Sequence, residues 1–187
     1  MSLKHAILGF LSYTPFSGYD LKKAFDRSVQ HFWPADQSQI YRTLAQLEEQ
    51  GLVTKEVIDR EDRLDLKIYH LTPAGLQELQ DWLSTPLPAE ATREPFLVQV
   101  FFAGKIADEE IAAVIEAEIH QVEERVAEYE DMYQKWLQKF PQLENQREFF
   151  FTLLTLEYGL RSNKTYLTWL EGALQRIRQK NYVPKEV

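Results

Sequence analysis

The chain has 187 residues, of which 44% are hydrophobic and 27% charged, and it contains no cysteine. This composition indicates a folded protein of one or two domains and excludes a disordered chain, a disulfide miniprotein and sites built on thiolates. The formal charge of -8 argues against a generally basic coat protein for nucleic acids or membranes. Without cysteine or a long apolar run, we expect a cytoplasmic protein with no membrane partner.

A proline-containing stretch divides the sequence into two predicted units. Pro86, Pro88 and Pro95 lie in the polar segment 84–95, where prolines break a helix. We therefore expect a boundary near residue 85. The two predicted domains cover residues 1–85 and 86–187.

Three helices are predicted at the start of the first unit. An apolar run near the amino terminus predicts the first, and Ser17 with Asp20 has the spacing of a capping box that begins the second. The third is expected over 37–50, because Asp36 can cap its start and Gly51 can end it in a left-handed conformation. The apolar residues that recur at helical spacing along it are Ile40, Leu44 and Leu47.

Two β-rich runs follow, at 52–58 and 67–71, joined by the charged segment 59–65. They predict a hairpin with a long tip. Thr72 and Pro73 then supply the cap and first residue of a fourth helix. The leucines of this helix that we expect to face the core are Leu76, Leu79 and Leu83. The order of these elements is typical of a winged helix-turn-helix.

The second unit is predicted to be almost entirely helical. A short helix at 94–103 is followed by a long helix from Asp108 and another beyond Pro141, each with a heptad-like apolar seam. The first seam comprises Ile115, Ile119, Val122, Val126, Tyr129, Tyr133, Trp136 and Phe140. The fold class is therefore mainly α, with an α+β winged helix-turn-helix part followed by a helical dimerisation domain of long coiled-coil-like helices.

Such seams need a partner surface. They can pack against each other, against the first unit or against a second copy of the chain, and we expect the last two together. The residues expected to form the dimer are Ile119, Val126, Tyr133, Leu153, Leu160, Asn163 and Leu167. Asn163 interrupts the second seam, and it either pairs with its symmetry mate, which would fix the register, or faces water.

The outward face of the third helix carries the candidate DNA contacts. Gln39, Arg42 and Gln46 can read base edges, because Arg pairs bidentately with guanine and Gln with adenine. Ser38 and Tyr41 suit phosphate oxygens. The spacing alone fits a solvated helix face without a partner equally well.

Basic residues outside this helix are candidates for the DNA backbone. Arg60, Arg63 and Lys67 on the hairpin, with Lys22 and Lys23 on the second helix, can neutralise phosphates. The hairpin holds four basic side chains against five acidic ones, so it is no strong basic patch. Residues 1–85 carry 9 basic and 12 acidic side chains, so most of the acidity belongs to the second unit.

The four tryptophans are candidates for an effector pocket. Trp33, Trp82, Trp136 and Trp169 could stack on a flat aromatic effector, although core and interface packing is the commoner use of such residues. No cofactor or metal is expected, because the four histidines lack ligand spacing. No nucleophile stands beside a matched base, so we expect no enzymatic activity.

Four blocks of the first unit resemble the PadR family of bacterial transcriptional regulators. The blocks are Ala6–Leu11, Ser17–Lys23, Ile40–Val53 and Tyr69–Gly75. They keep family-like order and spacing, and the match covers about residues 3–83. The segment 94–104 and the long helices after it are similar to the virulence-activator-like branch of the family.

The resemblance implies a homodimer that binds an inverted repeat of double-stranded DNA, usually as a repressor. In the family, the tyrosine matching Tyr41 lies near the DNA backbone, and the pair matching Gly18 and Tyr19 opens the second helix. Arg42 stands where many members have proline or a small residue, which can alter the bases read. Some members bind phenolic acids or flat hydrophobic drugs. The alternative is a winged-helix module whose acidic surface binds a protein instead of DNA.

Overall fold

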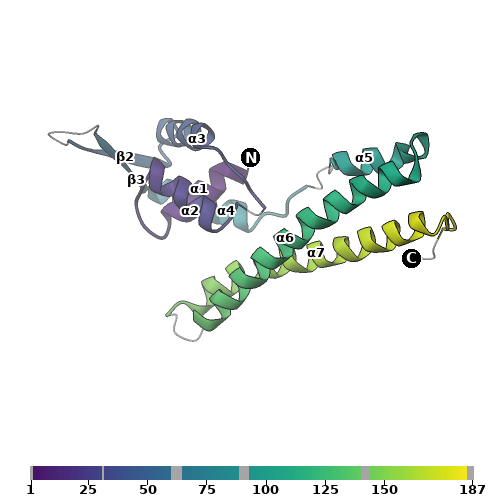
Figure 1. Ribbon diagram of the computed structural model, residues 1–187. Helices are drawn as coiled ribbons and strands as arrows, with labels where there is room; N and C mark the ends of the chain where they lie inside the picture. The colour runs from purple at the N-terminus through teal and green to yellow at the C-terminus, as the bar shows by residue number, and fades with distance from the viewer. Residues whose placement is uncertain (1, 31, 60–64, 89–92, 140–143, 185–187) are drawn as a thin grey trace. The chain divides into compact units, whose positions relative to one another are not determined.

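The chain forms two compact units, residues 1–90 and 91–187. Figure 1 shows the computed structural model, which describes residues 2–30, 32–59, 65–88, 93–139 and 144–184. None of the described helices combines the length and the apolar character needed to cross a bilayer.

The first unit has four helices and a small antiparallel sheet. Its helices are α1 (Ser2–Leu11), α2 (Gly18–Arg27), α3 (Gln37–Glu49) and α4 (Pro73–Leu83). Its strands are β1 (Phe16–Ser17), β2 (Val53–Ile58) and β3 (Leu66–Leu71), in the sheet order β1-β3-β2. This confirms the predicted winged helix-turn-helix, with one addition. Strand β1 was not predicted, and it places Phe16 opposite Tyr69 and Ser17 opposite Ile68.

Polar caps begin α2 and α3 where the sequence predicts them. The Ser17 hydroxyl accepts the Asp20 N–H at 3.1 Å and donates to the Asp20 carboxylate at 2.6 Å. At α3 the capping box is complete: the Gln39 N–H donates to the Asp36 carboxylate at 2.8 Å, and the Asp36 N–H donates to the Gln39 side chain at 3.0 Å. Gly51 follows α3 with a φ of +69°, the left-handed conformation expected of it.

The core of the first unit fixes which face of α3 points outward. Ile40, Leu44 and Leu47 are at most 1% exposed and pack among apolar residues of α1, α2 and the sheet. These three positions recur every three or four residues, so they hold one side of the helix against the core. The opposite side of α3 is left to solvent.

Gly75 determines how α4 sits on the sheet. A Cβ atom on Gly75 would lie only 2.1 Å from the Leu52 carbonyl oxygen, so this close approach requires glycine. Leu79, one turn later, is 7% exposed, as predicted. The expectation for Leu76 and Leu83 is wrong, because they are 40% and 67% exposed. Both lie about 100° around the helix from Gly75.

A polar cluster joins α1 to α4. Glu78 Oε1 lies 2.6 Å from Lys4 Nζ and 3.4 Å from His5 Nε2. The His5 ring stacks on Trp82 with their centroids 4.4 Å apart. The hydrogen bonds from Lys4 and His5 hold the pKa of Glu78 below its ordinary value.

Replacing Glu78 with glutamine should make the protein less sensitive to acid. A carboxylate with a lowered folded-state pKa stabilises the fold above its unfolded-state pKa, and this contribution is lost as the pH falls through the folded-state pKa. Urea unfolding at about pH 7 and about pH 3 should therefore show a smaller difference in unfolding free energy for Glu78→Gln than for wild type. Glu49→Gln, at an exposed position of α3, is the control. An equal pH difference in Glu78→Gln and wild type would contradict the stabilising role.

The second unit is built on two long helices that lie side by side (Figure 1). Its elements are α5 (Pro95–Phe102), the 3-10 turn η1 (Ala103–Lys105), α6 (Asp108–Lys139) and α7 (Gln146–Arg178). Ion pairs between Lys164 and Glu130, at 2.5 Å, and between Arg178 and Glu116 show that α6 and α7 run antiparallel. The buried residues between them are Ile111, Ile115, Ile119, Val122, Leu170 and Leu174.

The two seams therefore cover each other. This is the first of the three alternatives, and the helices are joined closely enough to fold back as a hairpin. The expected packing against the first unit and a second copy stays a prediction. Phe140 of the first seam lies outside the described residues.

Asn163 does not simply face water, and its pairing with a symmetry mate stays a prediction. Its side-chain oxygen accepts a hydrogen bond from Arg125 Nε of α6 at 3.4 Å, and its amide nitrogen donates to the Gly159 carbonyl at 2.7 Å. It is half-buried. Asn163 thus links α7 to α6 in the same protomer.

Candidate nucleic-acid interface

The outer face of α3 brings the candidate DNA contacts together. Ser38, Gln39, Arg42 and Gln46 are exposed, and Tyr41 is 39% exposed on the flank of the same helix. Their placement follows from the buried stripe on the opposite side. A helix that displays short polar, amide and guanidinium side chains along one face can enter a major groove and meet both base edges and phosphates.

The capping box restricts what Gln39 can do. Its side-chain oxygen already accepts the Asp36 N–H at 3.0 Å. Bidentate pairing with adenine uses both the oxygen and the nitrogen of the amide, so Gln39 can form it only by sharing its oxygen with the cap or by releasing the cap. Arg42 and Gln46 are the stronger candidates for reading bases.

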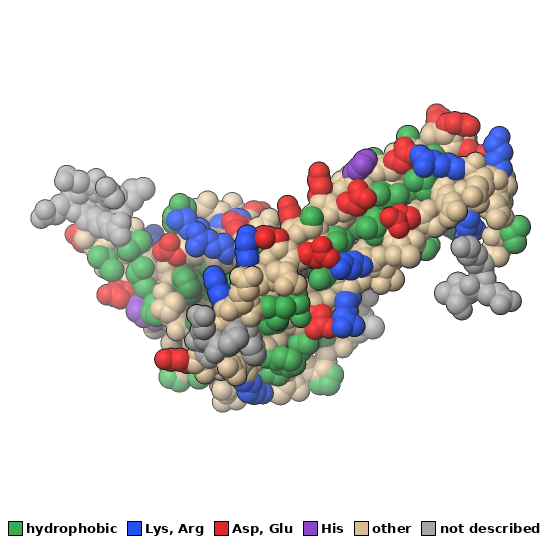
Figure 2. Space-filling view, turned by 60° about the horizontal axis from the view of Figure 1, so that its bottom comes forward, with side chains coloured by type: hydrophobic (Ala, Val, Ile, Leu, Met, Phe, Trp, Pro, Cys, Tyr) green, Lys and Arg blue, Asp and Glu red, His purple; other side chains and the backbone are tan. Residues whose placement is uncertain are grey.

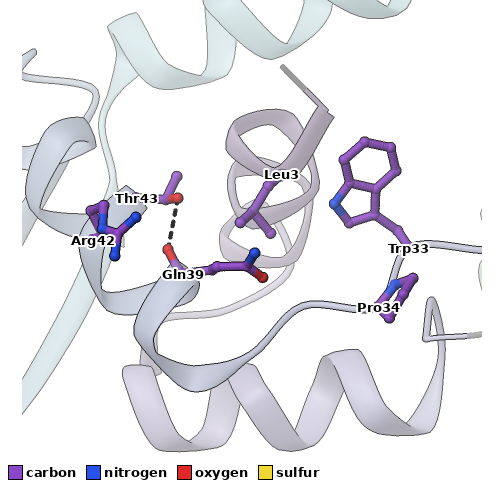
Figure 3. A pocket seen from close by; sticks show the side chains of 6 residues that line it. All are labelled: Leu3, Trp33, Pro34, Gln39, Arg42 and Thr43. Atoms are coloured by element: carbon purple, nitrogen blue, oxygen red, sulfur yellow. Dashed lines mark hydrogen bonds between the residues drawn. The ribbon is translucent and has the colours of Figure 1, made fainter.

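An open pocket of about 250 Å³ lies at the start of α3 (Figure 3). It is lined by Leu3, Trp33, Pro34, Gln39, Arg42 and Thr43. Figure 3 shows the Trp33 ring as one wall, with the Gln39 amide pointing into the space beside Leu3. The Thr43 hydroxyl donates to the Gln39 carbonyl at 2.8 Å, which occupies it within the helix.

The other three tryptophans pack on aromatic neighbours. Trp82 stacks on His5, Trp136 lies 4.9 Å from the Phe149 centroid, and Trp169 stacks on Tyr166 at 5.9 Å. Burial, with Glu118 nearby, raises the pKa of Tyr166 to about 12. An effector-binding role for the four tryptophans stays a prediction.

The candidate phosphate contacts differ in how available they are. Lys22 is half-buried and pairs with Asp26, one turn along α2. Lys23 is exposed, and its ammonium lies 4.3 Å from the centre of the Tyr19 ring. Lys67 is exposed on β3, opposite Val57. Arg60 and Arg63 lie outside the described residues. On the face shown in Figure 2, basic and acidic side chains are interspersed.

An ion pair that the sequence analysis missed ties the hairpin to α3. Lys55 Nζ lies 2.8 Å from a carboxylate oxygen of Glu48, and this hydrogen bond raises the pKa of Lys55. Lys55 also lies opposite Tyr69 in the sheet. Burial raises the pKa of Tyr69, and the positive charge of Lys55 partly offsets this rise. The signal was present in the alternation of β2, which puts Lys55 on the same side as the buried Val53.

The predicted dimer residues are partly covered within one chain. Ile119 and Leu153 are 9% and 8% exposed, so they already belong to the interior of the second unit. The half-buried members of the set are Val126, Tyr133, Leu160, Asn163 and Leu167. A different set of apolar side chains on α7 is exposed: Phe150, Phe151, Leu154 and Tyr158.

Comparison with known proteins identifies relatives of both units. Residues 7–81 match the model of the transcriptional regulator PadR-like family, and residues 92–178 match that of the virulence activator alpha C-term. The chain is 30% identical over 177 residues to the negative transcriptional regulator PadR of Bacillus subtilis, spanning 94% of this chain and 97% of that one. It is 41% identical over 87 residues, 46% of each chain, to the probable transcriptional regulator Rv1176c of Mycobacterium tuberculosis.

Solved structures show the same fold over almost the whole chain. Bacillus subtilis PadR in complex with operator DNA matches with a TM-score of 0.84 and 30% identity, covering 94% of this chain and 97% of that one. The Vibrio cholerae virulence activator AphA matches with a TM-score of 0.76 and 27% identity, covering 95% and 99%. From its matches across both units, we conclude that the chain belongs to the PadR-like family of transcriptional regulators.

Proposed function

We propose that this regulator is a homodimeric repressor that binds an inverted-repeat operator in double-stranded DNA through α3 of each copy. The observation that carries the proposal is the outer face of α3, where Arg42, Gln46, Ser38 and Tyr41 are displayed together on a capped and well-anchored helix. Further support comes from the Bacillus subtilis relative, a negative regulator whose structure with operator DNA resembles this chain.

The charge of the first unit limits the strength of nonspecific binding. Residues 1–85 carry 9 basic and 12 acidic side chains, so their net charge is -3. Nonspecific affinity depends on cations that neutralise phosphates. We therefore expect weak nonspecific binding that fades early as salt is added, with specific affinity resting on a few placed residues such as Arg42 and Lys67.

A second copy is proposed to cover the exposed apolar face of α7. At about 100° per residue, Phe150, Phe151, Leu154 and Tyr158 fall within an arc of about 100°. Leu153 and Leu156, which are buried, lie outside this arc, about 110° and 170° from its centre. Contiguous exposed apolar side chains mark an interaction site. A two-fold dimer also supplies the two symmetric α3 helices that an inverted repeat requires.

A small aromatic effector is proposed to regulate DNA binding. The Bacillus subtilis relative has been solved in complex with p-coumaric acid, and that structure matches this chain with a TM-score of 0.78. This supports a small aromatic effector here as well. A ligand that binds one separation of the two α3 helices better than another would shift operator affinity.

Arg42→Ala should relax base recognition at one position. Loss of a bidentate Arg–guanine pair costs about 1 to 3 kcal/mol against the preferred base, so a single base pair in each half-site should cease to matter. The measurement is binding to a set of duplexes in which each operator position is changed in turn. Unchanged discrimination at every position would refute the role of Arg42.

Lys67→Ala provides the contrast for this measurement. A phosphate contact carries no sequence information, so the loss of one from each copy should weaken binding to all duplexes alike and reduce the salt slope of the dimer by about 1.8, which is about 0.9 for each copy. If Lys67→Ala alters the preference for one base, its assignment to the backbone is incorrect.

A further inference from the structure

Gly18 and Tyr41 fit together at the junction of α2 and α3. A Cβ atom built on Gly18 would lie 2.4 Å from Cε1 of Tyr41, 2.7 Å from Cζ and 3.0 Å from the hydroxyl oxygen. Carbon atoms in contact normally stay about 3.5 to 4.0 Å apart. Only glycine at position 18 therefore leaves room for the tyrosine ring where it lies.

The nearest obstacle that a side chain at position 18 would meet is the side chain of Tyr41. All three atoms closest to the added Cβ belong to Tyr41, and none is backbone. A methyl group would therefore displace the ring. By contrast, the closest atom at Gly75 is a backbone oxygen. The close approach at Gly18 therefore affects mainly where the Tyr41 ring lies, and it affects the backbone of the unit less.

Tyr41 is a partly exposed residue of α3 whose ring lies against Gly18. It is 39% exposed on α3, and a helical residue has two favourable χ1 rotamers for a large side chain. Gly18 itself is buried at the first position of α2, so the ring rests against a fixed piece of backbone. Holding a side chain in its bound geometry lowers the entropy lost on binding.

We propose that Gly18 is a positioning residue for DNA binding: its missing side chain seats the Tyr41 ring against the start of α2 and so holds the phenolic hydroxyl in place to donate to a backbone phosphate. This inference rests on the proposed function, because it requires that Tyr41 contacts DNA. It assigns to Gly18 a role in affinity that acts through Tyr41 and involves no contact of its own.

The test measures how Gly18 and Tyr41 depend on each other. The probe is a duplex recovered by the full chain from a random-sequence library, with affinities measured by fluorescence anisotropy. Tyr41→Phe removes the hydroxyl and should weaken binding about tenfold for each copy in the dimer, the effect of one hydrogen bond to a charged group. Gly18→Ala should weaken binding by a similar factor. Added to Tyr41→Phe, Gly18→Ala should cause no further loss, whereas independent effects would multiply to about 100-fold for each copy.

Thermal unfolding separates positioning from a general loss of stability. Gly18→Ala should lower the melting temperature in wild type and in Tyr41→Phe, because the ring is present in both. In Tyr41→Ala the ring is gone, so Gly18→Ala should leave the melting temperature unchanged or raise it. Gly9→Ala, a helical glycine whose added Cβ would meet nothing within 4 Å, is the matched control and should change neither affinity nor fold.

Several results would overturn the role of Gly18. One is that Gly18→Ala binds DNA with wild-type affinity. Another is that Gly18→Ala weakens binding by the same factor in Tyr41→Phe as in wild type. If Gly18→Ala alone does not fold, the pair Gly18→Ala/Tyr41→Ala must fold and bind like Tyr41→Ala, and its failure would also overturn the proposal. A wild type that enriches no duplex would defeat the proposed function itself, which is a distinguishable outcome.

Discussion

Leu154→Glu is expected to turn the proposed dimer into a monomer and to weaken operator binding by about 100-fold or more. Leu154 lies at the centre of the exposed face of α7, between Phe151 and Tyr158. A carboxylate buried there between two copies would lose its hydration without gaining a cation. A monomer would bind one half-site alone and would lose the gain of about 10² to 10⁴ that comes from linking two sites.

The experiment compares oligomeric state and DNA affinity in the same samples. Sedimentation equilibrium should show one copy for Leu154→Glu and two for wild type, with equal helical content by circular dichroism. Thr152→Glu is the control, because Thr152 is exposed on α7 and lies about 160° away from Leu154 around the helix. A dimeric Leu154→Glu would show that the second copy docks elsewhere.

Gly75→Ala is expected to destabilise the first unit by about 3 kcal/mol, the upper part of the range for overpacking. Alanine is normally the better helix former by about 0.5 to 1 kcal/mol, so the usual sign is reversed here. The cause is the Leu52 carbonyl oxygen, 2.1 Å from the new Cβ position. That oxygen also accepts the Thr72 hydroxyl at 3.0 Å, so it cannot move without disturbing the cap of α4.

Urea unfolding of Gly75→Ala and Gly9→Ala provides the comparison. Both glycines lie in helices of the first unit, but a Cβ on Gly9 meets nothing within 4 Å. Gly9→Ala should therefore be neutral or stabilising, while Gly75→Ala lowers the midpoint. If the two variants unfold alike, the close approach of α4 to Leu52 does not constrain position 75.

Local signals explain why most of the fold could be predicted. Several helix starts of the first unit were predicted from their caps. Each cap involves residues within one turn of the helix start, as with Asp36 and Gln39 at α3. Gly51 marks the end of α3 in the same way, through its own φ. The buried stripe of α3 also follows from spacing alone, and with it the outward position of Arg42.

The features that were missed depend on distant partners. Strand β1 has two residues, too few for a period, and exists through pairing with Tyr69 and Ile68 of β3. The face of α4 is set by contact with Leu52, which no periodicity in α4 reveals. Heptad spacing shows that a seam is covered but does not say by what, so the pairing of α6 with α7 had to come from the structure.

The candidate site shows the same division. Residue type and helical spacing identified Arg42, Gln46 and Tyr41 as candidate DNA contacts, because both can be read from the sequence of α3 itself. The occupation of the Gln39 oxygen by the Asp36 N–H and the seating of Tyr41 against Gly18 depend on side-chain geometry. These contacts decide which members of an exposed face are prepared to meet DNA.

Selection of duplexes from a random-sequence library by the full chain tests whether two copies read an inverted repeat through α3. We predict enrichment of an inverted repeat whose half-site centres lie about one helical turn, 10 base pairs, or a whole multiple of it apart, bound by two copies of the chain. Enrichment of no sequence would contradict the claim and would favour a protein as the partner of this acidic winged-helix surface. Enrichment of a single half-site bound by one copy would contradict the proposed dimer.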